Sequence, residues 1–162
     1  MMQQRATAPV PPRFDSLEQE VFLNLWRTYD RLRALEDELF GRYELTPQQY
    51  NVLRLLRAEH PKTIPTLTLG ERLVSRAPDI TRMLDKLAQR GLIVRRRPHD
   101  NRRVVQVGVT DAGLELLREI GGPLRDCHAR QLGHLSAARL KRLSALLRAA
   151  RRPHETEQSS WR

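Results

Sequence analysis

The chain has 162 residues, a formal net charge of +10 and one cysteine. This length suits a single domain with a real core, and one cysteine excludes an intrachain disulfide framework. No apolar run approaches the roughly 20 residues of a membrane-spanning helix, and the N-terminus lacks the apolar region of a secretory signal, so we expect a cytoplasmic protein with no membrane partner.

The positive charge is unevenly distributed along the chain. Residues 13–45 carry five Lys/Arg against eight Asp/Glu, residues 68–110 carry ten against four, and residues 118–152 carry nine against two. A pI of about 11.0 indicates a polyanionic partner. The middle segment is the candidate surface for that partner, and the last segment is either a solvated helix face or a flank of the same surface.

The first predicted element is a long amphipathic helix over residues 14–41, which follows a proline-rich arm at residues 1–13 that we expect to be disordered. Asp15 or Ser16 can cap its start. Its apolar side chains recur at helical spacing and form a broad stripe. The stripe consists of Leu17, Val21, Phe22, Leu25, Trp26, Tyr29, Leu32, Leu35 and Leu39.

A second helix is expected to begin after Thr46, because Thr46-Pro47-Gln48-Gln49 has the form of a capping box with proline in the first turn. This helix should end before Pro61. Ile64 and its neighbours are a candidate for a short strand that pairs with strands further along the chain.

Two short helices separated by a turn are predicted between Thr66 and Gly91. Another capping box, Thr68-Leu69-Gly70-Glu71, opens the first of them. The second holds Pro78 in its first turn and ends at Gly91, which can adopt the left-handed conformation. Its polar face suits the major groove of DNA. The apolar stripe is Ile80, Leu84 and Leu87 with Met83 at its border, and the polar face is Arg82, Asp85, Lys86 and Gln89.

Two runs rich in β-branched residues follow, Leu92–Val94 and Val104–Val107, and they predict a hairpin. Pro98-His99-Asp100-Asn101 between them is typical of a turn. Five arginines crowd the strand ends and repel one another unless they meet anions. A solvated basic hairpin is the alternative, but beside a helix-turn-helix the pattern favours phosphate binding. The five are Arg95, Arg96, Arg97, Arg102 and Arg103.

The last third of the chain predicts two more helices. Thr110-Asp111 begins the first, which Gly121-Gly122-Pro123 should bend or break. Ser136 caps the second. The first and last helices of the chain have no partner inside a small helix-turn-helix core, so we expect a two-fold homodimer built from both ends; a monomeric helical bundle is the alternative. The apolar stripe of the last helix is Leu140, Leu143, Leu146 and Leu147.

Three stretches of the chain resemble the MarR family of transcriptional regulators: LTPQQYNVLRLL (Leu45 to Leu56), DITRMLDKLAQRGLIVRRR (Asp79 to Arg97) and NRRVVQVGVTDAGLELL (Asn101 to Leu117). The resemblance implies a mainly α, α+β winged-helix fold with one MarR-type domain at residues 14–151. Within it, a winged helix-turn-helix at residues 46–110, called the reading head below, is flanked by dimerisation helices at 14–41 and 111–151. Residues 152–162 are expected to form a flexible tail.

The resemblance also implies a regulator that binds double-stranded DNA sequence-specifically, as a homodimer on a palindromic site. We predict a repressor that a small phenolic or anionic ligand releases, with no cofactor. An architectural protein that coats DNA without sequence choice is the alternative, which suits a net charge of +10. We expect no enzyme, since the chain has no GxSxG, P-loop, Gly-rich dinucleotide turn or HExxH motif.

The predicted DNA contacts come from the second helix of the helix-turn-helix and from the wing. Arg76 and other basic residues would grip phosphates, and the helix would present its first turns to the major groove. The wing arginines would reach the minor groove or the phosphates beside it. The predicted contacts are Arg76, Pro78, Asp79, Arg82 and Lys86 around the helix, and Arg95, Arg97, Asn101, Arg102 and Arg103 in the wing.

The wing departs from the family pattern at one point. The family carries Asp-x-Arg at a fixed distance before a threonine, and counting back from Thr110 places Asn101 in the aspartate slot and Arg103 in the arginine slot. Asp100-Asn101-Arg102 spells the motif one residue early. A one-residue shift would reverse the face of every wing side chain, so the register favours Arg103, but the choice between the two arginines stays open.

Trp26, Tyr29, Tyr43 and Tyr50 lie on elements that could border a ligand cleft, although an aromatic residue on a helix stripe belongs more often to a core. Cys127-His128 with His134 matches no strong zinc spacing, so we predict no metal. Cys127 could sense oxidants if neighbours such as Arg125 and Arg130 lower its pKa. A free cysteine is more often a small buried apolar residue, and we expect small-molecule control.

Overall fold

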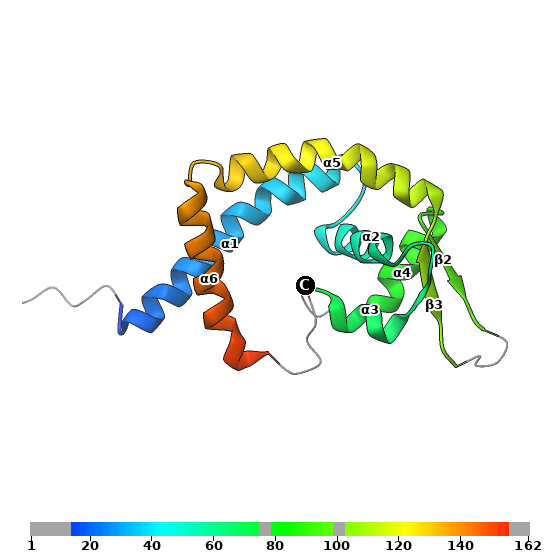
Figure 1. Cartoon of the computed structure of the whole chain (residues 1–162), viewed down its shortest axis with the longest axis horizontal. Helices are drawn as coiled ribbons and strands as arrows, with labels where there is room; N and C mark the ends of the chain where they lie inside the picture. The colour runs from blue at the N-terminus through cyan, green and yellow to red at the C-terminus, as the bar shows by residue number, and fades with distance from the viewer. Residues whose placement is uncertain (1–13, 75–78, 99–102, 156–162) are drawn as a thin grey trace, which may run out of the picture. The chain divides into compact units, whose positions relative to one another are not determined.

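The computed structural model describes residues 14–74, 79–98 and 103–155. The chain divides into two compact units, residues 1–34 and residues 35–162, which are described separately. The elements, labelled in Figure 1, are α1 (Leu17–Gly41), α2 (Pro47–Glu59), β1 (Ile64–Pro65), α3 (Thr66–Arg72), α4 (Ile80–Gln89), β2 (Ile93–Arg96), β3 (Gln106–Val109), α5 (Asp111–Leu132), α6 (Ala137–Arg151) and a 3-10 turn, Arg152–His154.

The first unit consists of the N-terminal part of α1. Ser16 caps the helix: its Oγ accepts a hydrogen bond from the Gln19 amide at 3.1 Å, and the Gln19 side chain accepts one from the Asp15 amide at 2.8 Å. The predicted apolar stripe is present but uncovered, since Leu17 is 70% exposed and Trp26 is 63% exposed. Exposure of so much apolar surface along one helix face marks it as an interaction surface.

In the second unit, α2 begins at the predicted capping box. Thr46 Oγ1 accepts from the Gln49 amide at 3.2 Å, and Gln49 Oε1 accepts from the Thr46 amide at 2.9 Å, with Pro47 as the first helical residue. The buried face of α2 forms the centre of the core, together with side chains from the end of α1, from α3, α4 and α5, and from the sheet. Its fully buried members include Phe40, Val52, Leu53, Leu56, Leu69, Leu84, Leu87, Val107 and Ile120.

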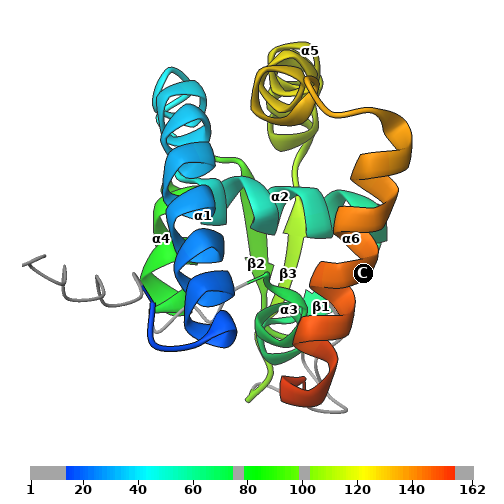
Figure 2. The same cartoon turned by 90° about the vertical axis from the view of Figure 1, so that its left-hand side faces the viewer.

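The sheet is antiparallel with the strand order β1-β3-β2. Ile64 pairs with Val107, which confirms the expected short strand, and Ile93 pairs with Val109 on the other side of β3. The third strand begins at Gln106, two residues later than the pattern of β-branched residues predicts. Figure 2 shows β2 and β3 running together beside α2 and α4, so the sheet and the helix-turn-helix share one core.

The predicted start of the first helix of the helix-turn-helix is wrong. The helix α3 begins at Thr66 and not at Thr68, and no side chain caps it. The reason is a long-range contact: the amide and the hydroxyl of Thr66 both donate to the Val105 carbonyl, at 3.0 and 3.2 Å, so the residue directly before β3 fixes where the chain turns into the helix. The local Thr68–Glu71 pattern is overridden by this contact.

The helix α5 continues through Pro123, so the break that the sequence allowed for is absent. A proline inside a helix removes one hydrogen bond and costs about 3 kcal/mol. Packing on both sides offsets that cost, because the same helix is buried at Leu117 and Ile120 before Pro123 and at Cys127 and Gln131 after it.

The start of α5 packs tightly against Gly91 and Leu92, directly before β2. Thr110 caps the helix, accepting from the Gly113 amide at 3.1 Å, and its hydroxyl donates to the Gly91 carbonyl at 2.6 Å. A Cβ on Gly113 would lie 2.4 Å from the Leu92 carbonyl oxygen, a distance that atoms do not tolerate. Only glycine therefore allows α5 and the end of the reading head to approach this closely.

The last helix, α6, begins at Ser136 as predicted, with Ser136 Oγ accepting from the Arg139 amide at 3.4 Å. None of its residues is buried, and Leu146 is 59% exposed. Of its leucine stripe, Leu143 and Leu146 are exposed, and Leu140 and Leu147 are half-buried. No helix in the described residues has the length and apolarity required to cross a membrane.

Candidate nucleic-acid interface

The recognition helix of the predicted helix-turn-helix is α4. It begins at Ile80, where Asp79 is the N-cap: the Asp79 carboxylate accepts from the Arg82 amide at 3.1 Å. Asp79, predicted as a DNA contact, therefore also has a structural role. Pro78 and Arg76 lie outside the described residues, so the place of Pro78 in the first turn and both DNA contacts stay predictions.

The apolar face of α4 packs as the sequence predicts. Leu84 and Leu87 are 0% exposed, and Ile80 and Met83 are half-buried against the core. Gly91 follows the helix with a φ of +69°, the left-handed conformation that ends a helix. This anchoring fixes the rotation of α4 about its axis and leaves its polar face outside.

Arg82 and Lys86 are exposed on that polar face. Neither has an ion-pair partner among the residues that the structure describes. Two unpaired cations on a rigid exposed helix face can donate to phosphates or to base edges.

Asp85 on the same face has a different role, because it pairs with Arg95 of β2. Arg95 was predicted to bind DNA, but its side chain is 28% exposed and bridges the wing to the recognition helix. The carboxylate neutralises the guanidinium, so Arg95 contributes less free charge to a phosphate surface than the sequence suggests.

The remaining wing arginines are exposed where they are described. The β2–β3 pairing runs from Ile93 with Val109 to Arg96 with Gln106, and Arg96, Arg97 and Arg103 lie at its open end with exposed side chains. Asn101 and Arg102 lie outside the described residues, so the choice between Arg102 and Arg103 stays a prediction.

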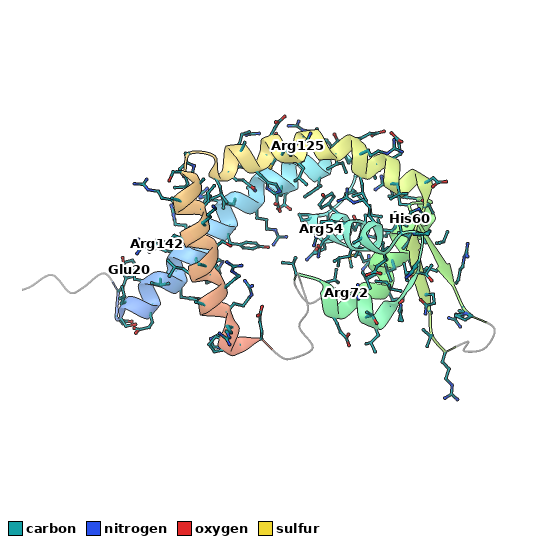
Figure 3. All side chains as sticks on the ribbon, in the orientation of Figure 1. Glu20, Arg54, His60, Arg72, Arg125 and Arg142 are labelled. Carbon is teal, nitrogen blue, oxygen red and sulfur yellow. The ribbon has the colours of Figure 1, made fainter. Side chains whose placement is uncertain are left out.

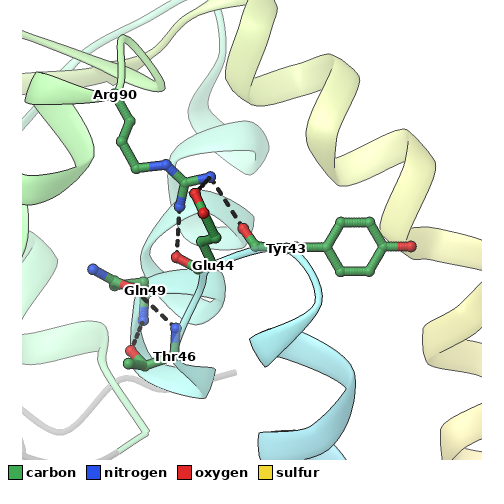
Figure 4. Close-up of polar contacts among 5 residues, drawn as sticks. All are labelled: Tyr43, Glu44, Thr46, Gln49 and Arg90. Atoms are coloured by element: carbon green, nitrogen blue, oxygen red, sulfur yellow. Dashed lines mark hydrogen bonds and ion pairs between the residues drawn. The ribbon is translucent and has the colours of Figure 1, made fainter.

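Other basic residues of the reading head are used for internal contacts that the sequence analysis missed. Arg72, labelled on α3 in Figure 3, pairs with Glu59 of α2 at 2.5 Å. Arg90, directly after α4, donates to two backbone carbonyls of the turn between α1 and α2, as Figure 4 shows. The sequence gives no sign of this contact. Arg90 stands beside Gly91, which ends the helix, but that position does not indicate a partner 46 residues away.

The four aromatic residues predicted for a ligand cleft divide between the two units. Trp26 and Tyr29 are exposed on the first unit, where Trp26 lies 6.3 Å from Phe22 between ring centroids. Tyr43 and Tyr50 are half-buried in the second unit, and Tyr50 stacks on Phe40 at 4.7 Å. Tyr50 is therefore a core aromatic.

Cys127 is buried, as the simpler interpretation predicted. Burial raises the pKa of its thiol, Glu36 and Glu38 raise the pKa further, and Arg130 lowers it. The thiol is thus kept in the unreactive protonated form. His128 Nδ1 hydrogen-bonds to Gln131 Oε1 at 2.8 Å, and the described residues contain no cluster of three side chains able to hold a metal.

Comparison with known proteins agrees with this geometry. The model of the MarR family matches residues 45–105. The organic hydroperoxide resistance transcriptional regulator of Bacillus subtilis is 31% identical over 109 residues, which are 66% of this chain and 72% of that protein.

Among solved structures, a MarR transcription factor from Planctomyces limnophilus is 55% identical, with 85% of this chain and 99% of that chain covered and a TM-score of 0.68. Sco3205 from Streptomyces coelicolor, a MarR family regulator solved in complex with DNA, is 19% identical and shares the fold, with a TM-score of 0.79 over 93% of this chain and 97% of that one. The chain belongs to the MarR family of DNA-binding transcriptional regulators, which are not enzymes.

Proposed function

We propose that the protein is a homodimeric repressor that binds a palindromic site on double-stranded DNA and is released by a small ligand. The observation that carries the proposal is the polar face of α4. Arg82 and Lys86 are exposed and without ion-pair partners in the described part of the chain, on a helix whose other face is locked by Leu84 and Leu87. Such a helix enters the major groove as a rigid body.

The proposed DNA contacts are Arg82 and Lys86 in the major groove and Arg97 with Arg103 in or beside the minor groove, with Asn101 and Arg102 between them. Arg76 would bind phosphates, and Pro78 would contact the major groove beside Arg82 and Lys86. Asp79 would act mainly through its cap on α4, and Arg95 mainly through its ion pair with Asp85. Each of these roles can be tested by a single substitution.

The proposal of a homodimer rests on two uncovered apolar stripes. Phe22 is 62% exposed on α1 and Leu146 is 59% exposed on α6, and each has apolar neighbours at helical spacing. Covering both stripes with the same stripes of a second copy buries them without any other protein. Residues 14–41 and 111–151 would then be dimerisation helices around a reading head at residues 46–110.

The proposal of a small phenolic or anionic effector is supported by family membership and by the half-buried Tyr43 near the end of α1. Trp26 and Tyr29 would join a binding site if the dimer brings them to it. The raised pKa of Cys127 argues for a ligand and against a thiol as the signal.

Footprinting on DNA from the region around the gene tests the proposal directly. A repressor of this kind protects one short site with two-fold symmetry, and its two half-sites lie about 34 Å apart along one face of the duplex. Sedimentation of the full chain at micromolar concentration should give about 38 kDa, twice the 18.9 kDa of one copy.

A second candidate is a protein that coats DNA without sequence choice. It is favoured by the cations of α5 and α6, two of which, Arg125 and Arg142, are labelled in Figure 3. In the described residues, neither they nor Lys141 and Arg148 have a carboxylate within ion-pair distance. Uniform protection of any DNA fragment in the footprint would favour coating over the repressor.

A further inference from the structure

Arg90 makes a two-pronged contact with the turn that joins α1 to α2. Its Nη1 donates to the Glu44 carbonyl at 2.6 Å and its Nη2 donates to the Tyr43 carbonyl at 3.0 Å. The same guanidinium lies 4.0 Å from the Glu44 carboxylate. All these groups belong to the second unit, and Figure 4 shows the guanidinium reaching from the end of α4 to both carbonyls.

The turn that Arg90 contacts is also held by backbone hydrogen bonds and by buried side chains on both sides. The Tyr43 and Leu45 amides both donate to the Phe40 carbonyl at 3.0 Å, and Glu44 has a left-handed φ of +53°. Phe40 and Leu45 are buried, at 1% and 5% exposure. The capping box of Thr46 begins α2 directly afterwards. The turn is therefore tied to the last turn of α1 by these hydrogen bonds.

A planar guanidinium with two parallel hydrogen bonds restricts orientation as well as distance, which a single point charge does not. Carbonyls at a helix end otherwise have no partner within the helix, and a cation there also meets the favourable end of the helix dipole. Arg90 thus links the end of α4, the helix that would read DNA, to the turn directly after α1, and both belong to the second unit.

We propose that Arg90 is a positioning residue that sets the specificity for half-site spacing, because it fixes the direction of α4 relative to the end of α1. The inference rests on the proposed homodimer. If the two recognition helices of a dimer are held at one separation, the dimer can bind an operator with a changed spacing only by distorting the reading head. That distortion weakens binding. Removal of the guanidinium relaxes that constraint, so spacing discrimination falls along with affinity.

The test compares operators with the footprinted spacing and with one base pair inserted or deleted between the half-sites. Arg90→Ala in the full chain is expected to bind the native operator about 10-fold more weakly, as for a lost charged hydrogen bond. The ratio of affinities for native and altered spacing should fall about 5-fold relative to the wild type. Arg90→Lys retains the charge but cannot donate two hydrogen bonds from one planar group. It should restore the affinity for the native operator more than it restores the ratio of affinities for native and altered spacing.

Arg72→Ala is the matched control, because it also breaks one arginine contact, with Glu59, but inside the reading head at 2.5 Å. It should leave the spacing ratio at the wild-type value even if it weakens binding. An unchanged ratio in Arg90→Ala and Arg90→Lys, in dimers shown by sedimentation, overturns the inference and leaves the proposed function intact. A monomeric wild type overturns the proposed dimer first and the inference with it. If Arg90→Ala does not fold, Arg90→Lys and Arg90→Gln decide the question through the same ratio.

Discussion

The helices α4 and α6 have similar sequence features but differ in how deeply they are buried. Each begins at a side-chain cap, Asp79 or Ser136, and each combines a leucine stripe with basic residues. Yet α4 buries Leu84 and Leu87 completely, whereas α6 buries no residue. An apolar stripe therefore indicates that a helix needs a partner, but it does not say whether the partner is in the same chain.

The comparison also separates two uses of positive charge. Near α4, three arginines make contacts inside the molecule, namely Arg72, Arg90 and Arg95. These contacts help to hold the helix that exposes the cations of Arg82 and Lys86. On α6, Lys141 and Arg142 lie on a helix that has no fully buried residue. Positive charge therefore indicates a DNA-binding surface more strongly where the helix beneath it is packed against the core.

The largest effect is expected from the buried side of α4. Leu84→Ala should lower the free energy of unfolding by about 2–5 kcal/mol, because it leaves a cavity in a closely packed core. Denaturant unfolding under conditions that keep the chain monomeric measures the loss. The matched change Leu146→Ala on α6 should cost less than about 0.5 kcal/mol there; equal losses would show that α6 is packed within the monomer.

The exposed side of α6 should matter only for association. Leu143→Asp is expected to weaken dimerisation by at least about 2 kcal/mol, since it places a charge within the apolar stripe. Sedimentation should then show the 18.9 kDa monomer at concentrations where the wild type is a dimer. The monomer's unfolding transition should not move. Persistence of the dimer would place its interface elsewhere.

On the polar side of α4, Arg82→Ala should weaken specific DNA binding by about 1–3 kcal/mol with little change in melting temperature. The reason is that Arg82 is exposed and makes no ion pair in the described residues. Arg95→Ala is the informative contrast, because it removes the ion pair with Asp85 and should lower the melting temperature as well. A thermal shift in Arg82→Ala of the same size would assign Arg82 to an internal network.

Within the wing, Arg103→Ala should cost about 1–3 kcal/mol of operator binding, and more than Arg102→Ala. The strand register counted back from Thr110 is the reason. Electrophoretic titration of both variants at one salt concentration ranks them. A larger loss in Arg102→Ala would mean that Asp100-Asn101-Arg102 is the functional motif.

The smallest effect on DNA binding is expected at Cys127. Cys127→Ser should leave operator affinity nearly unchanged, and peroxide should not release the wild type, because burial raises the thiol pKa. A raised folded-state pKa also stabilises the fold fully below the unfolded pKa of about 8.5, and this contribution is lost as pH rises through the folded value. The wild type should thus lose more stability than Cys127→Ser above about pH 8.5. Release by peroxide only when Cys127 is present would establish thiol sensing.

Sequence patterns predicted those elements whose signals are local. The caps at Ser16, Thr46, Thr110 and Ser136 were all found, because an N-cap and the amide it accepts from are three residues apart. The short strand at Ile64 and the stripe of α4 were predicted for the same reason. The resemblance to the MarR family rested on three stretches of sequence, which begin at Leu45, Asp79 and Asn101.

The predictions that were wrong or incomplete have one cause in common, which is contact with residues far away in the sequence. The start of α3 is decided by Val105, 39 residues away from Thr66. The continuity of α5 through Pro123 is decided by packing on either side. The roles of Arg90 and Arg95 depend on partners that only the folded chain brings near, namely the α1–α2 turn and Asp85. The number of arginines predicted a basic surface, but it did not predict which of these arginines make contacts inside the folded chain.

The glycine at the start of α5 has a consequence for selection experiments on this regulator. Because a methyl group at position 113 would collide with the Leu92 backbone carbonyl, which cannot rotate away, no side chain of any chemistry is acceptable there. A library randomised at this codon and screened for repression should return glycine alone. Every other amino acid then becomes a loss-of-function marker that is independent of DNA contacts and effector, and a second-site revertant of Gly113→Ala would reveal which neighbours of α5 can yield.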